Sequence, residues 1–210
     1  MLKVGLTGSI AVGKSYVVSV LAELGCMTFD ADKVAHSVML PGTPAYKDIV
    51  AEFGRDVIST DGTIDRQKLG PIIFSDEARR LRLNQIVHPR VMEEQNRLLS
   101  EAAERDPGGI AIVDAALMIE SGGYKRFDKL IVVYCDRETQ ITRLMRRNQI
   151  DRADAERRVA AQMSSEEKLR YADCSIDTSG TFENTHQRVL QVFDELVKLK
   201  NPAAATIETE

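Results

Sequence analysis

The chain has 210 residues, which is enough for one domain of ordinary size with small insertions. Its 43% of hydrophobic residues is sufficient for a sizeable core. The formal net charge of −4 argues against general attraction to nucleic acid, so any anion site must be local. The first residues lack the long apolar stretch that is typical of a signal peptide, and no run of about 18 apolar residues occurs, so we expect a cytoplasmic protein without a membrane segment.

Strand and helix patterns alternate along the chain. Helical spacing of apolar residues runs from residue 14 to residue 24, and Gly25 is a typical end for that helix. Continuous apolar strands separated by helices are typical of an α/β fold with a parallel sheet covered on both faces. The five expected strands are Leu2–Leu6, Cys26–Phe29, Ile110–Val113, Lys129–Cys135 and Cys174–Asp177.

Two helical stretches interrupt this alternation and are interpreted as insertions on one sheet. They cover residues 38–105 and residues 137–170. The core is then expected to comprise residues 1–37, 106–136 and 171–200. The last segment, 201–210, is small, polar or acidic, and we expect it to be flexible.

The strongest motif is Gly8-Ser9-Ile10-Ala11-Val12-Gly13-Lys14-Ser15, which fits G-x-x-x-x-G-K-[ST] in full. It follows a predicted strand and opens a predicted helix. Glycines let the backbone approach phosphate oxygens, so that successive N–H groups and the helix N-terminus bind the anion. Lys14 is expected to reach the β- and γ-phosphates and Ser15 to ligate Mg²⁺. The motif predicts a nucleoside triphosphate site but not a particular reaction.

Acidic residues lie at the carboxyl ends of the predicted strands, where ligands collect in open parallel sheets. Asp30 and Asp32 follow the second strand, and a carboxylate there suits the orientation and deprotonation of an acceptor hydroxyl. The alternative is a helix cap, with Asp32 at the N-cap. Asp114 ends the third strand, as a Mg²⁺-binding carboxylate would, although a simple loop aspartate also explains it.

The segment from Arg137 to Arg158 holds seven arginines and no lysine. Arg143 and Arg147 are four residues apart, so they share a helix face and suit a closing lid that neutralises phosphate charge. The alternative is a solvated helix with internal ion pairs, which we expect for Arg152, Arg157 and Arg158 beside their acidic neighbours.

Single residues elsewhere carry weaker signals. A lone histidine such as His88 is more often a packing or capping residue than a catalyst, and Pro89 is expected to begin a helix. The three cysteines, Cys26, Cys135 and Cys174, show no metal-site spacing and are expected to be buried thiols in a reducing compartment.

Among classes with this motif, a small-molecule kinase fits best. A GTPase would carry a guanine-binding N-K-x-D motif, and a motor ATPase would usually need a longer chain. A kinase needs only a short core, an acceptor-binding insertion and a lid. A kinase acting on a nucleoside or sugar, and a nucleotide-binding regulator without kinase activity, remain as alternatives.

An ordered set of motifs, spread from about residue 3 to about residue 195, resembles the dephospho-CoA kinase family. Besides Gly5–Ser15, the matching segments are Asp30-Ala31-Asp32 with Ala35-His36, Asp61–Arg66 with Leu69 and Phe74, Leu83–Val91, Glu120, Arg143–Arg147, Gln162, Ala172-Asp173 and Ile176–Gly180.

The resemblance implies that ATP phosphorylates the ribose 3′-hydroxyl of dephospho-CoA with Mg²⁺, in a monomer or weak homo-oligomer without nucleic acid or membrane partners. It implies a helical acceptor domain at 38–105 and a lid at 137–170. By this likeness Asp32 is the candidate base and Lys14 the phosphate clamp, and Arg143 and Arg147 belong to the lid; these four are the expected catalytic residues. The likeness places His88 in the acceptor domain, and the expected acceptor contacts are Asp30, Asp32, His88 and Glu120. From the motif and the strand ends, Ser15 and Asp114 are expected to hold the metal. The expected ATP contacts are Gly8, Ala11, Val12, Gly13, Lys14, Ser15 and Tyr16 of the loop and, by the likeness, Asp177 and Ser179.

The sequence departs from the family pattern in three places. Tyr16 replaces a common threonine, which leaves Ser15 intact. Ala115–Glu120 lacks the proline usually found after the third strand, which puts the shape of that loop in doubt. Thr178 stands where asparagine is common, which puts its expected adenine contact in doubt.

Overall fold

The structure is a computed structural model that describes residues 1–200; the predicted tail at 201–210 lies outside the described residues. The chain divides into two compact units. One contains the residues up to Phe29 together with those from Ala102 onward, and the other is Asp30–Glu101. The second unit therefore begins eight residues before the expected insertion boundary at residue 38. Residues 137–170 belong to the first unit.

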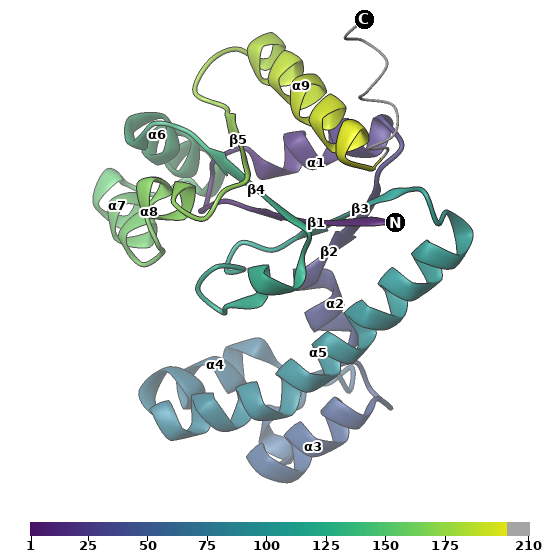
Figure 1. The fold of residues 1–210 in the computed structure, drawn as a ribbon. Helices are drawn as coiled ribbons and strands as arrows, with labels where there is room; N and C mark the ends of the chain where they lie inside the picture. The colour runs from purple at the N-terminus through teal and green to yellow at the C-terminus, as the bar shows by residue number, and fades with distance from the viewer. Residues whose placement is uncertain (201–210) are drawn as a thin grey trace, which may run out of the picture. The chain divides into compact units, whose positions relative to one another are not determined.

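A five-stranded sheet forms the centre of the first unit, with the strand order β2-β3-β1-β4-β5 (Figure 1). β1 pairs in parallel with β3 and with β4, and β4 pairs in parallel with β5. This order confirms the predicted α/β class with a parallel sheet, and it places β1 at the centre. The strands are β1 (Leu2–Thr7), β2 (Met27–Asp30), β3 (Ile110–Asp114), β4 (Lys129–Tyr134) and β5 (Cys174–Asp177).

One face of the sheet is covered by α1 (Lys14–Glu23) and α9 (Phe182–Lys200). Val17, Val20 and Leu21 of α1 pack with the fully buried strand residues Val4 and Leu6. Burying such aliphatic side chains contributes about 1.5–3 kcal/mol each, which is the main term that holds the layers together. As predicted, α1 ends just before a glycine, because Gly25 has a φ of +92° that favours glycine.

The opposite face of β1 is in close contact with the chain that follows β3. A Cβ atom added to Gly5 would lie 2.5 Å from the Met118 sulfur and 3.0 Å from the Phe127 ring. A larger residue at the middle of β1 would therefore force these side chains to shift, and the chain after β3 packs directly on the strand that leads to the glycine-rich loop.

The arginine-rich segment folds into three helices whose starts follow local capping rules. Asp136 caps α6 and Asp151 caps α7 through their carboxylates, and Ser164 with Glu167 forms a capping box at α8. The helices are α6 (Arg137–Asn148), α7 (Arg152–Ala160) and α8 (Ser165–Leu169). Outside this segment, a short 3₁₀ turn at Gly123–Arg126 lies between β3 and β4.

The second unit is helical and has its own core. Ile49, Phe53, Val57 and Leu69 are buried together. Its elements are α2 (Ala31–Ser37), α3 (Pro44–Phe53), a 3₁₀ turn at Arg55–Val57, α4 (Arg66–Ser75) and α5 (Glu77–Arg105), which runs on into the first unit.

Pro89 lies in the interior of α5, so the prediction that it begins a helix is wrong. Ile86 and Val87 precede it and pack against the core of the unit. Their burial favours a continuous helix on both sides of the proline, even though proline removes one helix hydrogen bond.

Within residues 1–200, no helix is both long enough and apolar enough to span a membrane.

Candidate nucleotide-binding site

The loop Gly8–Ser15, called the P-loop below, connects β1 to α1. A Cβ atom on Gly8 would lie 2.4 Å from the Val133 carbonyl oxygen, so the loop leaves the sheet where only glycine fits. Ala11 and Gly13 have φ angles of +61° and +87°. Left-handed residues of this kind turn successive amide groups toward one side, which makes a concave anion-binding surface.

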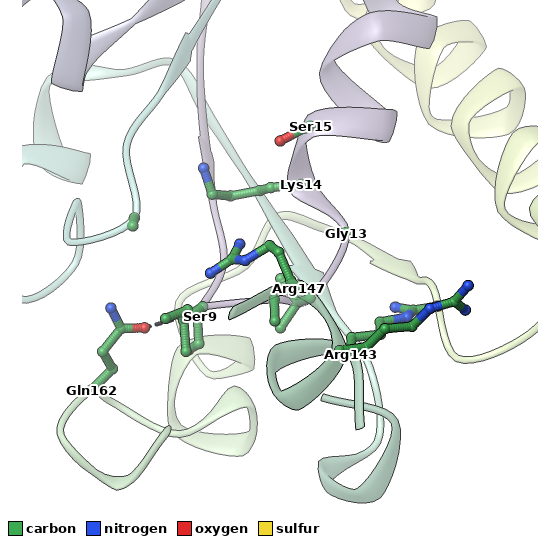
Figure 2. Close-up of a pocket in the computed structure, with 12 residues that line it drawn as sticks. Ser9, Gly13, Lys14, Ser15, Arg143, Arg147 and Gln162 are labelled. Carbon is green, nitrogen blue, oxygen red and sulfur yellow. Dashed lines mark hydrogen bonds between the residues drawn. The ribbon is translucent and has the colours of Figure 1, made fainter. Parts of the chain in front are cut away.

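A cleft of about 700 Å³ lies over the P-loop (Figure 2). This volume lies within the range of small-molecule sites. Within the part of the chain that the structure describes, four cationic side chains and no carboxylate line it. The cleft therefore favours a polyanion. Its lining residues are Ser9, Ile10, Ala11, Val12, Gly13, Lys14, Ser15, Ala116, Arg143, Arg146, Arg147 and Gln162.

Lys14 and Asp114 form an ion pair at the base of the cleft. Asp114 is the last residue of β3 rather than the first residue after it. Both side chains are largely buried, so the pair is less screened by water than a surface pair. A lysine ammonium group has three N–H donors, so Lys14 has donors for phosphate oxygens besides the one that Asp114 accepts.

Arg143 contacts the edge of the P-loop through Thr178. Its guanidinium group donates to the Thr178 hydroxyl oxygen at 2.9 Å and to the Thr178 carbonyl oxygen at 2.7 Å. The Thr178 hydroxyl in turn donates to the carbonyl oxygen of Val12 at 2.6 Å. Thr178 is buried, so this chain of hydrogen bonds holds the turn around Gly13 from the side of β5.

Arg147 lies one turn further along α6 and lines the same cleft, as the four-residue spacing predicts. Its Nε donates to the Asn148 side chain at 2.9 Å, and the residue is exposed. Arg152 and Arg157 instead pair with acidic neighbours, which confirms the ion pairs expected for these two arginines.

Two glutamines hold the tip of the P-loop: Gln140 lies in α6, and Gln162 lies just after α7. The Gln162 side-chain oxygen accepts from the Ile10 N–H at 2.7 Å, and the Gln140 amide donates to the Ile10 carbonyl oxygen at 2.7 Å. The Ser9 hydroxyl donates to the Met163 carbonyl oxygen at 2.8 Å. The arginine-rich segment is therefore bonded to the P-loop, an arrangement that sequence reasoning did not predict.

The other residues predicted to contact ATP lie beside the cleft. The Ser179 hydroxyl donates to Asp177 at 2.6 Å and accepts from the Asp136 N–H at 2.9 Å, so both residues flank Thr178 at the start of α6. The Tyr16 ring packs edge-on against Phe182, with ring centroids 5.0 Å apart.

Glu120, a predicted acceptor contact, forms an ion pair with Lys168 of α8. Sequence reasoning missed Lys168 altogether, although it is fully buried. A lysine on a short polar helix gives no pattern that separates it from a solvated residue.

Asp30 and Asp32 belong to the second unit. The Asp30 side chain caps α2, because its Oδ1 accepts from the N–H groups of Asp32 and Lys33 at 2.9 and 3.0 Å. The expectation that this pair caps a helix is therefore confirmed for Asp30 and wrong for Asp32, which lies in the first turn and is exposed. His88 is exposed on α5.

The three cysteines are buried, as predicted, and none forms a disulfide. Burial raises the pKa of each thiol, Cys26, Cys135 and Cys174, to about 11. Because the thiolate is the reactive form, these residues are packing groups rather than nucleophiles.

A parallel sheet with a P-loop between its central strand and the next helix, under a cationic cleft, defines a P-loop nucleotide-binding protein. The family model described as dephospho-CoA kinase matches residues 2–184. The chain belongs to the dephospho-CoA kinase family, which confirms the resemblance drawn from its motifs.

Individual relatives agree with this assignment. The chain is 45% identical to a dephospho-CoA kinase of Geobacter metallireducens over 96% of this chain and 100% of that protein. It is 45% identical to one of Leifsonia xyli over 89% of this chain and 94% of that protein. A solved dephospho-CoA kinase from Campylobacter jejuni has a TM-score of 0.72 and 27% identity, covering 93% of this chain and 97% of that one.

Proposed function

We propose that this chain is the dephospho-CoA kinase of its source: it transfers the γ-phosphoryl group of ATP to the ribose 3′-hydroxyl of dephospho-CoA, giving CoA and ADP. The observation that carries the proposal is the cationic cleft over the P-loop, in a chain whose family model covers residues 2–184. The O3′–P bond forms as the bond between the γ-phosphorus and the β,γ-bridging oxygen breaks.

In this proposal the P-loop binds the β- and γ-phosphates through its backbone N–H groups, and Lys14 binds the same phosphates through its ammonium group. Arg143 and Arg147 line the cleft and would neutralise charge on the transferring group. Because Arg143 is already bonded to Thr178, it also supports the loop, whereas the exposed Arg147 is the better candidate for movement onto the phosphates.

The residues present fit a Mg²⁺ ion. Ser15 at the start of α1 and Asp114 at the end of β3 offer a hydroxyl and a carboxylate, and hard oxygen donors are what Mg²⁺ prefers. Within residues 1–200, no group of three or more His, Cys, Asp and Glu side chains is arranged around one metal position. That suits Mg²⁺, which binds through one or two protein ligands, substrate phosphates and water. Ser15 and Asp114 would hold the ion, whose positive charge would offset the negative charge of the phosphate oxygens.

Asp32 is the proposed base that accepts the proton of the ribose 3′-hydroxyl. Its carboxylate lies on the exposed first turn of α2, whose cap is supplied by Asp30, so capping does not occupy it. Asp30, His88 and Glu120 complete the proposed acceptor contacts. The helical unit would then bind the acceptor, and residues 137–170 would act as the lid.

An acceptor panel tests the proposal. The protein is incubated with ATP and Mg²⁺ plus dephospho-CoA, adenosine, or a sugar, and both ADP and phosphorylated acceptor are measured. We expect rapid turnover only with dephospho-CoA. Preference for an acceptor without the pantetheine arm would indicate a different kinase, and ATP binding without any phosphorylated product would indicate a nucleotide-binding regulator.

A further inference from the structure

We propose that Lys168 is a positioning residue for the phosphoryl-transfer site, and that it acts by fixing residues 115–122, the β3 loop, beside the P-loop. This inference rests on the proposed function for its kinetic test alone. The structural claim concerns only contacts within the first unit.

Lys168 is the largest side chain that is fully buried. Burying an ammonium group is strongly unfavourable unless the charge is paired and its donors are satisfied. Its three donors match three acceptors: Nζ lies 2.9 Å from the Ala116 carbonyl oxygen and 2.8 and 2.9 Å from the two Glu120 carboxylate oxygens. The pairing is complete, and both partners belong to the β3 loop.

The β3 loop contributes one residue to the lining of the cleft. This residue is Ala116, two residues beyond the Asp114 that pairs with Lys14. The Ala116 carbonyl oxygen also accepts from the Thr7 hydroxyl at 3.2 Å, at the end of β1 where the P-loop begins. Lys168 therefore holds the backbone at the point where β1, β3 and the cleft meet.

The segment that carries Lys168 is also bonded to the P-loop. Lys168 lies on α8, whose N-cap Ser164 directly follows the segment that bonds to Ser9 and Ile10 through Met163 and Gln162. Residues 162–168 thus bond to both the P-loop and the β3 loop. A misplacement of about 1 Å in such an arrangement lowers turnover by up to about 10²-fold.

The main variant is Lys168→Met, which keeps the length of the side chain and removes its charge and donors. A contact between residues that follow these two segments, Tyr124 edge-on to Tyr171 with ring centroids 5.2 Å apart, does not involve Lys168 and is left in place in that variant. Two controls match its other effects. Lys129→Met removes a lysine that pairs with Asp173 away from the cleft, and Val192→Ala removes buried volume on the far side of the core.

All variants are assayed with ATP and dephospho-CoA at a temperature where thermal unfolding shows each to be folded. We expect Lys168→Met to lower kcat by roughly 10- to 100-fold with little change in ATP affinity, while both controls retain wild-type kcat. Amide hydrogen exchange is expected to accelerate in residues 115–122 of Lys168→Met alone. Wild-type kcat and unchanged exchange in Lys168→Met would overturn the proposal.

Glu120→Gln and the double variant Lys168→Met/Glu120→Gln separate positioning from stability. Glu120→Gln leaves a buried ammonium group without its counter-charge, so it should unfold at a lower temperature than the double variant. Because Glu120 is also a proposed acceptor contact, the readout for this pair of variants is amide hydrogen exchange rather than kcat. If Lys168 positions the loop, the double variant regains stability while exchange in residues 115–122 stays faster than in the wild type. Recovery of wild-type exchange together with stability would show a structural role only and overturn the proposal.

Failure of the proposed function can be distinguished from failure of the proposed role of Lys168. If wild-type protein does not phosphorylate dephospho-CoA, the proposed function fails. The hydrogen-exchange comparison then still decides whether Lys168 fixes the β3 loop.

Discussion

Replacement of Gly13 by alanine tests the geometry of the phosphate cradle. Gly13 has a φ of +87°, and an alanine in that left-handed region is strained by roughly 1–2 kcal/mol. The new Cβ would lie 3.2 Å from the Thr178 hydroxyl oxygen, whose bonds to Val12 and Arg143 would have to shift. A weakened hydrogen bond adds about 1 kcal/mol. The variant relieves this cost of about 2–3 kcal/mol only by moving the loop out of its left-handed conformation, and ATP binding has to restore that conformation. We therefore predict ATP binding that is up to about 150-fold weaker.

Gly25→Ala is the matched control for that variant. Gly25 has a similar φ of +92° at the other end of α1, but an added Cβ would meet nothing within 4 Å. Both variants should therefore lower the melting temperature, by about 2–8 °C. Only Gly13→Ala should weaken ATP binding in isothermal titration calorimetry. Wild-type ATP affinity in Gly13→Ala, or an equal loss in Gly25→Ala, would refute the reasoning.

Three further predictions concern single groups. Asp32→Asn should lower kcat by about 10²-fold or more with folding unchanged, because the ribose 3′-hydroxyl then has no base to take its proton. Normal turnover in this variant would show that Asp32 is not the base. The thiols of Cys26, Cys135 and Cys174 should react with Ellman's reagent only after unfolding. Because their folded pKa of about 11 exceeds the ordinary value of 9.0, the stability from keeping them neutral is complete below pH 9.0 and is lost as pH rises to 11. Hydrogen bonds, chiefly from the Ser59 hydroxyl, lower the pKa of Asp61 from 3.8 to about 2, so its contribution holds above pH 3.8 and is lost toward pH 2. A carboxyl ¹³C titration of Asp61 near pH 3.8 contradicts that account.

The sheet and the P-loop followed from the sequence because their signals are local. Apolar runs such as Ile110–Val113 specify buried strands, and Gly8 and Gly13 occupy backbone positions that a side chain would disrupt. The sequence also predicts that Arg143 and Arg147 share one helix face, because residues four apart in a helix lie on the same side. Both residues line the same cleft.

Contacts between distant segments did not follow from the sequence. Lys168 bonds to Glu120, which lies 48 residues away in the sequence, and Gln162 bonds to Ile10, which lies 152 residues away. No periodic pattern in the sequence predicts such pairs. The sequence places Thr178 in the Ile176–Gly180 match and as a departure from an expected adenine contact, but it does not indicate that the Thr178 hydroxyl bonds to the Val12 carbonyl oxygen. Pro89 was misassigned because the burial of Ile86 and Val87 outweighs the local preference of proline for a helix start.

The capping box at Ser164 and Glu167 was a signal that the sequence did contain. It marks the start of α8, and with it the helix that carries Lys168. The burial of Lys168 still depends on packing against the chain after β3, and this packing is visible only in the folded structure.

The central claim is that the site in the cleft over the P-loop transfers the terminal phosphoryl group of ATP to an alcohol oxygen rather than to water. The most direct measurement uses ATP labelled with ¹⁸O on its γ-phosphate, dephospho-CoA and Mg²⁺, with mass spectrometry of the product. The account predicts CoA that carries the labelled phosphoryl group on its ribose 3′-oxygen, formed in equal amount with ADP. Labelled inorganic phosphate without labelled CoA would contradict it.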